Sequence, residues 1–595
     1  MPQHGKPMKA RPIKFPDDRQ ATPKPFIAGA GAPIGLAMQD ALAALFQQGL
    51  AHQQQGQLDE AKAAYERMLA LQPHHADALH MLGVIALQLG NYPVAVEFIS
   101  AAVHKHPSNA SAHLHLGLAF QALQRLEEAL SCYQHALELR PDYAQAFHNR
   151  GLGLHVAGRL DEALADFDKA IELQPEEAQA WNNRGVVLQD QLRWDEAMQS
   201  YAAAIAAQPG YGQAHYNLGN ALRALGRFEA AIASYDTAIA LQADLAHAFN
   251  NRGLALQELQ RSAEAIASYD AAIASRPDYA DAYWNKAIEL LLCGDFAQGW
   301  KFYEWRWRRD AFSSRKRAFA QPLWLGQASL AGKAVLLHAE QGLGDSIQFC
   351  RYARDVRALG AEVLLEVPQP LMALFETLHG DIRLFEKGAD LPHFDYHCPL
   401  LSLPLAFQTR LETLHGHTAY LASGASKRDH WERRLGSPSK PRIGLVWSGN
   451  ALDRNDAQRS VGLNALLPHL PPRFEYICLQ KELRSADQEA LQASSVRFVG
   501  AEIQDFSDTA ALCDLVDLVI SVDTSVAHLA GALGKPTWIL LPYAPDWRWM
   551  LDRDDSPWYP SVKLYRQDRD RSWTPVLERI ASDILGYAHF RTPKR

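Results

Sequence analysis

The sequence predicts an α-solenoid followed by two α/β domains. Two observations predict this order: a 34-residue repeat fills the first half of the chain, and short apolar runs alternate with helical ones in the second half. The length agrees, because 595 residues correspond to about four domains of ~150 residues each. We expect a disordered basic tail at 1–36, eight helix pairs over 42–310, a linker over 311–330, an α/β domain over 331–425, a second linker over 426–440 and a second α/β domain over 441–590.

A glycine register and a proline register define the repeat. Glycine recurs every 34 residues, with Ala287 in the eighth position: Gly49, Gly83, Gly117, Gly151, Gly185, Gly219 and Gly253. Proline keeps the same spacing, with Ala243 in its one gap: Pro73, Pro107, Pro141, Pro175, Pro209 and Pro277. Because proline does not continue a helix, each unit should be two helices that close before the next unit begins.

The pattern resembles tetratricopeptide repeats, whose stacked helix pairs form a superhelix with a concave face. Two residues before the glycine or alanine, five consecutive units carry an asparagine: Asn149, Asn183, Asn217, Asn251 and Asn285. An amide offers donors and an acceptor, so this row suits the backbone of an extended peptide. The row also resembles the asparagine track of O-GlcNAc transferases, which implies a polypeptide acceptor or partner protein. Hydrogen bonding between helices, or a solvated surface, is the alternative.

The second half has the alternation of an α/β protein. After Lys333 the strand candidates are AVLLH, EVLLEV and DIRLFE, with a helix expected from about Asp345 to Leu359. After a Gly/Ser/Pro/Lys-containing stretch, a second series of strand candidates follows: IGLVWS, FEYICLQ, VRFVG, LVDLVISV and TWILLP. Two Rossmann-like domains with a cleft between them are therefore expected.

The most informative stretch of the second domain runs strand, turn, helix and strand, with the turn at Asp523, Thr524 and Ser525. A turn that opens a helix presents free amides and a positive dipole end to a phosphate, and His528 lies one turn further on. The segment resembles the nucleotide-sugar-binding segment of the family-9 glycosyltransferases, the heptosyltransferase family. That family's pattern is Asp-Thr-Gly-x-x-His-x-x-Ala, and here Ser525 replaces the glycine.

The first domain carries Gly-Leu-Gly-Asp at 342–345, between a strand and a helix. In the same family a Gly-Asp at this place supplies the catalytic base, which the resemblance assigns to Asp345. Glu340, near the end of the preceding strand, is the alternative base. A plain helix-capping role for Asp345 is the structural alternative.

Further donor contacts are expected at the ends of two strands of the second domain. A small-residue turn followed by a cation suits a diphosphate, which makes candidates of Ser448, Gly449, Asn450 and Arg459. An ordinary strand-end loop is the alternative. The resemblance adds Lys481 as a nucleoside contact. The aromatic residues around 546–549 either stack on base or sugar or fill the edge of the cleft.

Composition narrows the functional classes. A net charge of −8 gives no global field for nucleic acid, and six cysteines without a C-x-x-C pair argue against a disulfide framework or zinc ribbon. Neither a secretory h-region nor an uninterrupted apolar span is present in the sequence, so we expect a cytoplasmic protein without a transmembrane span. No Asp-x-Asp pair follows a clear strand, which favours chemistry without a metal.

The resemblance over about 333–590 implies an inverting, metal-independent glycosyltransferase of the GT-B kind. It would move a sugar from a nucleoside-diphosphate donor to an acceptor, expected to be a protein held by the repeats, with no other cofactor. Two alternatives stay open: a repeat scaffold whose transferase domain is not catalytic, and an enzyme that takes a saccharide acceptor.

Overall fold

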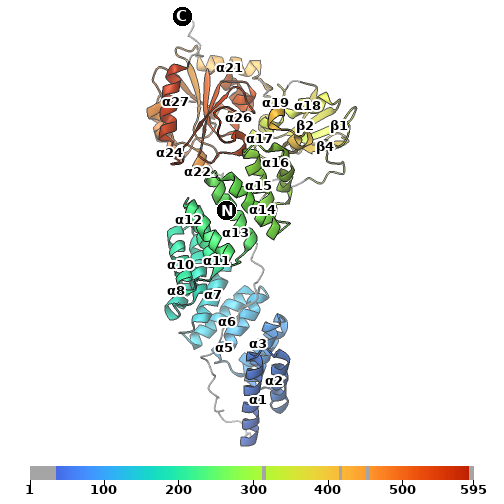
Figure 1. Ribbon diagram of the computed structural model, residues 1–595, viewed down its shortest axis with the longest axis vertical. Coiled ribbons are helices and arrows are strands. Elements are labelled where there is room, and N and C mark those ends of the chain that lie inside the picture. Colours follow the sequence, from blue (N-terminus) through green and yellow to red (C-terminus); the bar gives the residue numbers. More distant parts are fainter. Residues whose placement is uncertain are drawn as a thin grey trace. The chain divides into compact units, whose positions relative to one another are not determined.

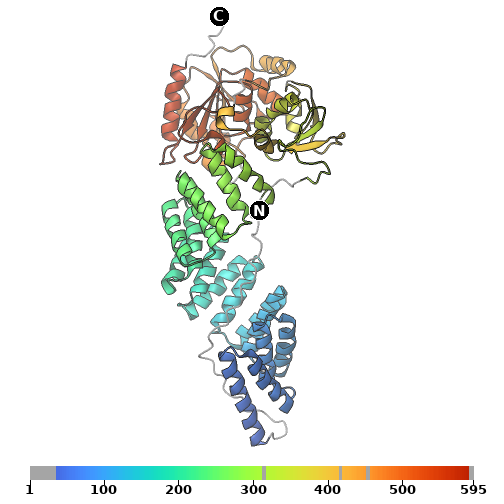
Figure 2. The same ribbon diagram turned by 45° about the vertical axis from the view of Figure 1, so that its right-hand side comes forward.

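The computed structural model describes residues 35–310, 312, 317–378, 380–414, 419–450 and 456–587. The tail expected at 1–36 lies almost wholly outside these residues. The chain divides into two compact units, Met1–Ala243 and Asp244–Arg595. The described part of the first unit is helical, whereas the second combines helices with two sheets (Figures 1 and 2). Within the described part, no helix has both the length and the apolar character required to cross a membrane.

The first unit consists of consecutive antiparallel helix pairs (Figure 1). Its helices are α1 (Leu36–Gln54), α2 (Leu58–Leu71), α3 (Ala76–Gln88), α4 (Tyr92–Lys105), α5 (Ala110–Ala122), α6 (Leu126–Leu139), α7 (Ala144–Val156), α8 (Leu160–Leu173), α9 (Ala178–Asp190), α10 (Trp194–Ala207), α11 (Gly212–Ala224) and α12 (Phe228–Ala240).

Each glycine of the register faces the large side chain sixteen residues later. A Cβ on Gly219 would lie 2.6 Å from Cε1 of Tyr235, and one on Gly83 would lie 2.3 Å from Cγ1 of Ile99. Carbon atoms in contact prefer about 3.5–4.0 Å, so a larger residue would push the two helices apart. The Tyr235 ring is fully buried, and its hydroxyl donates a hydrogen bond to Asn220 at 2.8 Å. The glycine register therefore sets the distance between the helices of one repeat.

The turn inside each repeat requires a left-handed residue. Positive φ angles recur every 34 residues: Gly56, Gly90, Gln124, Gly158, Leu192, Gly226, Gln260 and Gly294. Glycine adopts this conformation readily, whereas the side chains at Gln124, Leu192 and Gln260 cost roughly 1–2 kcal/mol each. This requirement is visible only in the backbone, because three of the eight positions carry no glycine.

The second unit begins with four helices at the same spacing and a short 3₁₀ helix, η1 (Glu304–Arg308). The four helices are α13 (Leu245–Glu258), α14 (Ser262–Ser275), α15 (Ala280–Leu292) and α16 (Phe296–Tyr303). Two sheets follow, and every strand pair in them is parallel.

The first sheet has the order β3-β2-β1-β4. Its elements are β1 (Ala334–His338), α17 (Leu343–Phe349), α18 (Tyr352–Ala358), β2 (Glu362–Val367), α19 (Met372–Phe375), β3 (Ile382–Glu386), β4 (Tyr396–Pro399) and α20 (Leu403–Ala406). One face packs against helices, and the other is covered by Phe319 and Phe394. In the described residues this first domain therefore departs from the Rossmann-like expectation, which places helices on both faces.

The second sheet has the order β10-β9-β8-β5-β6-β7. Its elements are α21 (Ala425–Leu435), β5 (Arg442–Val446), α22 (Asp456–Arg459), α23 (Leu463–Leu466), β6 (Glu475–Cys478), α24 (Ser485–Gln492), β7 (Arg497–Phe498), α25 (Phe506–Asp514), β8 (Leu518–Val522), α26 (Ser525–Ala532), β9 (Thr537–Leu541), β10 (Val562–Arg566) and α27 (Thr574–Gly586). Side chains alternate along β5 between two cores, one shared with α27 and the other with α21 and α25. Helices therefore cover both faces.

Several boundaries differ from the sequence predictions. The helix expected at 345–359 is two helices, α17 and α18, and the stretch expected as a linker at 426–440 begins with α21. Part of the other linker, 311–330, belongs to the first sheet, because the Trp324 amide donates to the His397 carbonyl at 2.9 Å. The short strands β4 and β10 were not predicted from the sequence.

The last repeat is part of the α/β core. Trp300 and Tyr303 of α16 are buried together with Trp547 and Trp558. The Trp300 and Trp547 rings meet edge to face at 5.3 Å and 88°. Burying such side chains stabilises a core by roughly 2–3 kcal/mol each. The end of the 34-residue pattern is therefore not the edge of a separate core.

Candidate active site

Two helix starts meet where the two α/β domains face each other. Helix α17 begins just after β1, and α26 begins just after β8. A Cβ on Gly344 would lie 3.0 Å from Cδ2 of His528 and 3.4 Å from Cα of Ser525. A side chain at residue 344 would therefore require His528 to shift by a few tenths of an ångström. The fold thus brings together the two motifs that the sequence singled out separately.

Asp345 lies at this contact, with its side chain 19% exposed. Its Oδ2 accepts a hydrogen bond from the Gly342 amide at 3.0 Å, and its Oδ1 is ion-paired with Arg548. Burial raises the pKa of Asp345, and the Arg548 guanidinium opposes that rise. The hydrogen bond from Gly342 is a contact at the start of a helix. The capping role, which the sequence offered as the alternative, therefore accounts for one of the two carboxylate oxygens of Asp345. The other oxygen depends on Arg548.

Arg548 was not singled out by the sequence, which drew attention only to the aromatic residues beside it. It lies in η7 (Trp547–Trp549), with its guanidinium 4.4 Å from the Trp547 ring. Its Nε donates to Gln348 at 2.7 Å and its Nη1 to Asp546 at 2.8 Å. No local sequence signal indicates this pairing, because Gln348 lies 200 residues earlier in the chain.

His528 is a buried, neutral side chain. Its Nδ1 lies 3.0 Å from the Tyr559 hydroxyl, and its ring stacks on Trp549 at 5.3 Å. Burial lowers the pKa of His528 well below its usual value, and Arg548 and Arg351 lower it further. The histidine can therefore offer a hydrogen bond to a ligand, but at neutral pH it does not supply the positive charge expected to meet an anion.

The turn before α26 combines a half-buried carboxylate with uncapped amides. Burial, reinforced by Asp546, raises the pKa of Asp523 to about 6, and its Oδ1 lies 3.8 Å from Nε2 of His528. Thr524 is the N-cap residue, but among the described residues no side chain caps the helix start, and its hydroxyl lies 3.2 Å from that of Ser521. Thr524 and Ser525 are half-buried. The first amides of α26 are thus presented as a phosphate site would require.

The loop after β5 is organised around a carboxylate that the sequence did not suggest. Asp456 is buried, and it accepts hydrogen bonds from the Gly449 amide at 3.1 Å and from the Ser460 hydroxyl at 2.8 Å. Arg484 pairs with the same carboxylate, and Nε of Arg459 lies 3.6 Å from it. The expected phosphate contacts at Gly449 and Arg459 are therefore also parts of a loop-stabilising network.

The other predicted donor contacts of the second domain, Ser448, Asn450 and Lys481, have different surroundings. Ser448 is buried and its hydroxyl accepts a hydrogen bond from Gln480 at 2.9 Å, whereas Asn450 is exposed. Residues 451–455, which connect this turn to Asp456, lie outside the described part. Lys481 is exposed and donates to the Gln504 carbonyl at 3.1 Å.

Glu340 does not share the position of Asp345. Its carboxylate is 1% exposed and accepts hydrogen bonds from Nε and Nη2 of Arg306 at 3.0 and 2.8 Å. The Leu401 amide donates to its other oxygen at 3.2 Å. Burial raises the pKa of Glu340 while Arg306 opposes the rise. Glu340 thus ties η1 to the first α/β domain, and its role as the alternative base stays a prediction.

The asparagine row takes part in bonds between neighbouring repeats. Asn217 donates to Asn182 at 2.8 Å, and Asn285 donates to Asn250 at 2.9 Å, in both cases across 35 residues. Asn183 lies 2.9 Å from His148 in the same relation. In the remaining contacts, Asn149 donates to the Gln145 carbonyl at 2.9 Å and Asn251 accepts from Asn250 at 3.2 Å. Hydrogen bonding between helices, the alternative role of the row, thus accounts for several of these amides. Most of the side chains in the row are only half-buried.

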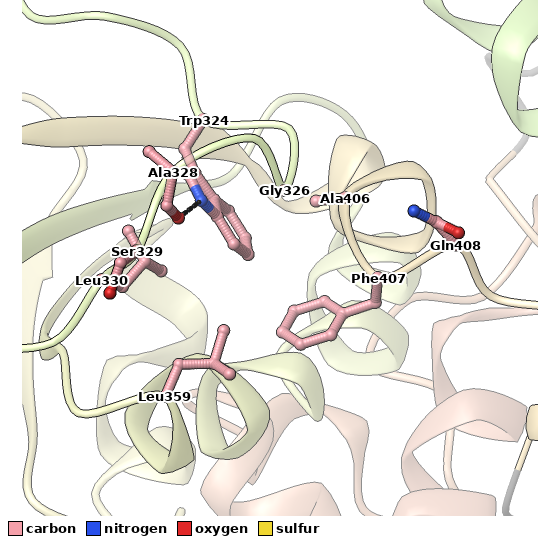
Figure 3. Close-up of a pocket in the computed structure, with 9 residues that line it drawn as sticks. All are labelled: Trp324, Gly326, Ala328, Ser329, Leu330, Leu359, Ala406, Phe407 and Gln408. Atoms are coloured by element: carbon pink, nitrogen blue, oxygen red, sulfur yellow. Dashed lines mark hydrogen bonds between the residues drawn. The ribbon is translucent and has the colours of Figure 1, made fainter.

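A cavity of about 390 Å³ lies elsewhere in the first α/β domain (Figure 3). Trp324, Leu359 and Phe407 line it, and Trp324 Nε1 donates to the Ala328 carbonyl at 2.9 Å. No carboxylate, histidine or cation is among its lining residues. It therefore offers none of the acid–base or anion-binding groups found around Asp345.

Comparison with known families identifies the helical part. Models described as tetratricopeptide repeat match residues 46–110, 108–176, 148–211 and 250–298, and a model described as TPR repeat matches residues 219–260. These segments are tetratricopeptide repeats. Together they leave the α/β part of the chain unmatched by these models.

Individual proteins share parts of the chain. Protein FlbA of Caulobacter vibrioides is 29% identical over 328 residues, which cover 51% of this chain and 54% of FlbA. The match thus spans about half the length of that relative. Among solved structures, MamA is 25% identical, covering 27% of this chain and 94% of its own, with a TM-score of 0.26. A thermophilic TPR protein of Thermus thermophilus is 26% identical, covering 30% and 98%, with a TM-score of 0.27.

Proposed function

We propose that this protein is an inverting, metal-independent glycosyltransferase of the GT-B kind that takes its sugar from a nucleoside-diphosphate donor. The observation that carries the proposal is the contact of Gly344 with Ser525 and His528, which places a carboxylate beside an uncapped helix start. A base and an anion site within one contact are what a single displacement at a sugar carbon requires.

In this proposal Asp345 takes the proton of the acceptor hydroxyl as that oxygen attacks the anomeric carbon. The bond from that carbon to the diphosphate breaks in the same step, which inverts the configuration. The amides at the start of α26 hold the departing diphosphate, and neutral His528 contributes a hydrogen bond. Asp523, close to His528, keeps that side chain oriented.

We further propose that the acceptor is a polypeptide bound by the tetratricopeptide repeats. Such repeats form a scaffold for protein binding, and the half-buried amides of the asparagine row suit an extended backbone. A saccharide acceptor would need only the α/β domains.

The test incubates the purified chain with a panel of nucleotide sugars, with and without candidate acceptor proteins, and measures release of nucleoside diphosphate. We expect release with at least one donor, and retention of the sugar on an acceptor protein detected by mass spectrometry. Neither binding nor release with any donor would favour a repeat scaffold without catalysis. The engagement of both Asp345 oxygens and the replacement of glycine by Ser525 are the observations that favour that second candidate.

A further inference from the structure

A single short segment, Asp546–Met550, contacts the last repeat and both α/β domains. Trp547 meets Trp300 of α16 edge to face at 5.3 Å. Trp549 stacks on His528 of α26 at 5.3 Å and 17°. Between these two rings, Arg548 reaches Asp345 and Gln348 of α17. Whatever moves this segment therefore acts on the candidate base and on the start of α26 together.

The Arg548 side chain is 10% exposed, and three acceptors fix its guanidinium. Nε donates to Gln348, Nη1 to Asp546, and Nη2 pairs with Asp345. Because the guanidinium is planar and rigid, it cannot turn without losing several of these bonds at once. It therefore determines the direction of the Asp345 carboxylate, whose other oxygen is held by Gly342.

The backbone that carries Arg548 is strained just after it. Met550 has φ 54° and ψ −173°, a region that residues other than glycine rarely occupy and that costs about 1–3 kcal/mol. Arg566 of β10 holds the preceding residue, because it donates to the Trp549 carbonyl at 2.6 Å. The Met550 side chain lies against the turn of the last repeat, where a Cβ on Gly294 would be 3.0 Å from Cε of Met550.

We propose that Arg548 is the positioning residue of this site: it keeps the Asp345 carboxylate ionised and in a fixed orientation, while Trp547 and the last repeat keep Arg548 in place. The inference rests on the proposed function, in which Asp345 accepts a proton. A buried carboxylate without a cation beside it becomes protonated near neutral pH and then cannot act as a base. The Arg548 cation thus helps to keep the Asp345 carboxylate ionised, as a base must be.

The other groups around Asp345 do not replace that cation. Asp546 faces it from the same segment as Arg548 and repels its charge. Tyr303 approaches from α16 with burial raising its pKa above its usual value, and neutral His528 of α26 lies against the neighbouring Gly344. Among the described residues, the ion pair with Arg548 is the direct contact of Asp345 with a cation.

The experiment measures turnover against pH in full-length Arg548→Gln, Arg548→Lys and Arg566→Lys, using the donor found active in the wild-type chain. Arg548→Gln should move the acid limb of the profile upward by about 1–3 pH units, because Asp345 then needs a higher pH to ionise. Arg548→Lys should bring the limb back toward the wild-type position. Arg566→Lys alters support of the same segment without touching Asp345, so it should lower turnover and leave the limb in place.

An unmoved acid limb in Arg548→Gln, with a wild-type circular dichroism spectrum, would overturn the proposal. A limb that also moves in Arg566→Lys would overturn it as well, because the effect would then come from the segment and not from the Arg548 charge.

A measurement without donor separates this inference from the proposed function. Unfolding of Asp345→Asn, Arg548→Gln and the double variant is compared at neutral pH, as a double-mutant cycle. Strong coupling is expected, with the double variant much more stable than the sum of the single losses predicts. Absence of nucleoside diphosphate release with every donor would refute the proposed function alone. Additive losses in the cycle would refute the positioning role of Arg548.

Discussion

The repeats of the first unit and the candidate site of the second are held together by contacts of very different reach. In the first unit, recurring hydrogen bonds between helices join residues 12, 16 or 35 positions apart, as Tyr133 to Gln121, Arg150 to Asp166 and Asn217 to Asn182 illustrate. In the site, the bonds that connect the two α/β domains join residues about 200 positions apart, as in Arg548 to Asp345 and Arg548 to Gln348. A periodic sequence can specify the first kind repeatedly, whereas each contact of the second kind is made once.

Substitutions in the last repeat should have the largest effect, because this repeat belongs both to the periodic pattern and to the α/β core. Trp300→Ala should destabilise the second unit by about 3–5 kcal/mol and also reduce turnover, because Trp547 and Arg548 lose support. Tyr235→Ala removes an equally buried ring from the first unit. It should cost a similar amount in urea unfolding and leave donor turnover unchanged. Equal turnover in the two variants would remove the distinction between these regions.

The next largest effect concerns the candidate base. Asp345→Asn keeps the side-chain size and the bond from Gly342 but cannot accept the proton, so turnover should fall by ~10²-fold or more. Donor binding, measured by calorimetry, should stay nearly unchanged. Near-normal turnover would move the base to Glu340 or elsewhere.

The asparagine row offers an effect of intermediate size. If the row binds a polypeptide, Asn183, Asn217 and Asn251 changed together to Ala should raise KM for a protein acceptor, with about 0.5–1.5 kcal/mol lost per amide. Asn182→Ala is the matched control, because it breaks the same bond between repeats as loss of Asn217 but lies outside the row. A KM change of equal size in the control would assign the row to repeat packing.

The turn before α26 predicts a pH-dependent stability difference. Since the native pKa of Asp523 is about 6 and its ordinary value is 3.8, the folded state binds the extra proton between these values and loses stability as pH rises through them. Asp523→Asn should therefore stabilise the protein at pH 7.5 by up to ~3 kcal/mol, seen as a higher melting temperature, and have little effect near pH 4. A difference independent of pH would assign the gain to packing.

The smallest effect lies in the turns of the first unit. Leu192 is 70% exposed and has φ 61°, so Leu192→Gly should stabilise that unit by roughly 0.5–1 kcal/mol. Gly158→Ala, at φ 75° in the preceding turn, should destabilise it by about 1 kcal/mol. Chemical denaturation followed by circular dichroism measures both. A loss in Leu192→Gly would mean that the exposed leucine has a packing role.

The sequence by itself determined most of the repeat architecture. The spacing of Gly219 and Tyr235 specifies a close helix pair, because both residues lie on neighbouring helices of one unit and every unit repeats the arrangement. The short apolar runs likewise indicated β1, β2 and β8, since buried parallel strands are apolar on both faces. The two motifs of the site were also found in the sequence, because each lies on one short segment between a strand and a helix and resembles a family pattern there.

The contacts between distant segments of the chain became visible only in the tertiary structure. Arg548 has no local pattern that marks it as the partner of Asp345, and the four-residue strand β4 has too short a pattern to be recognised. Nor could the sequence show that His528 is neutral, because its charge depends on burial and on Arg548 and Arg351 nearby. Spacing along the chain fixes contacts within a repeat, but the protonation and direction of a site group depend on residues that only the folded chain brings close.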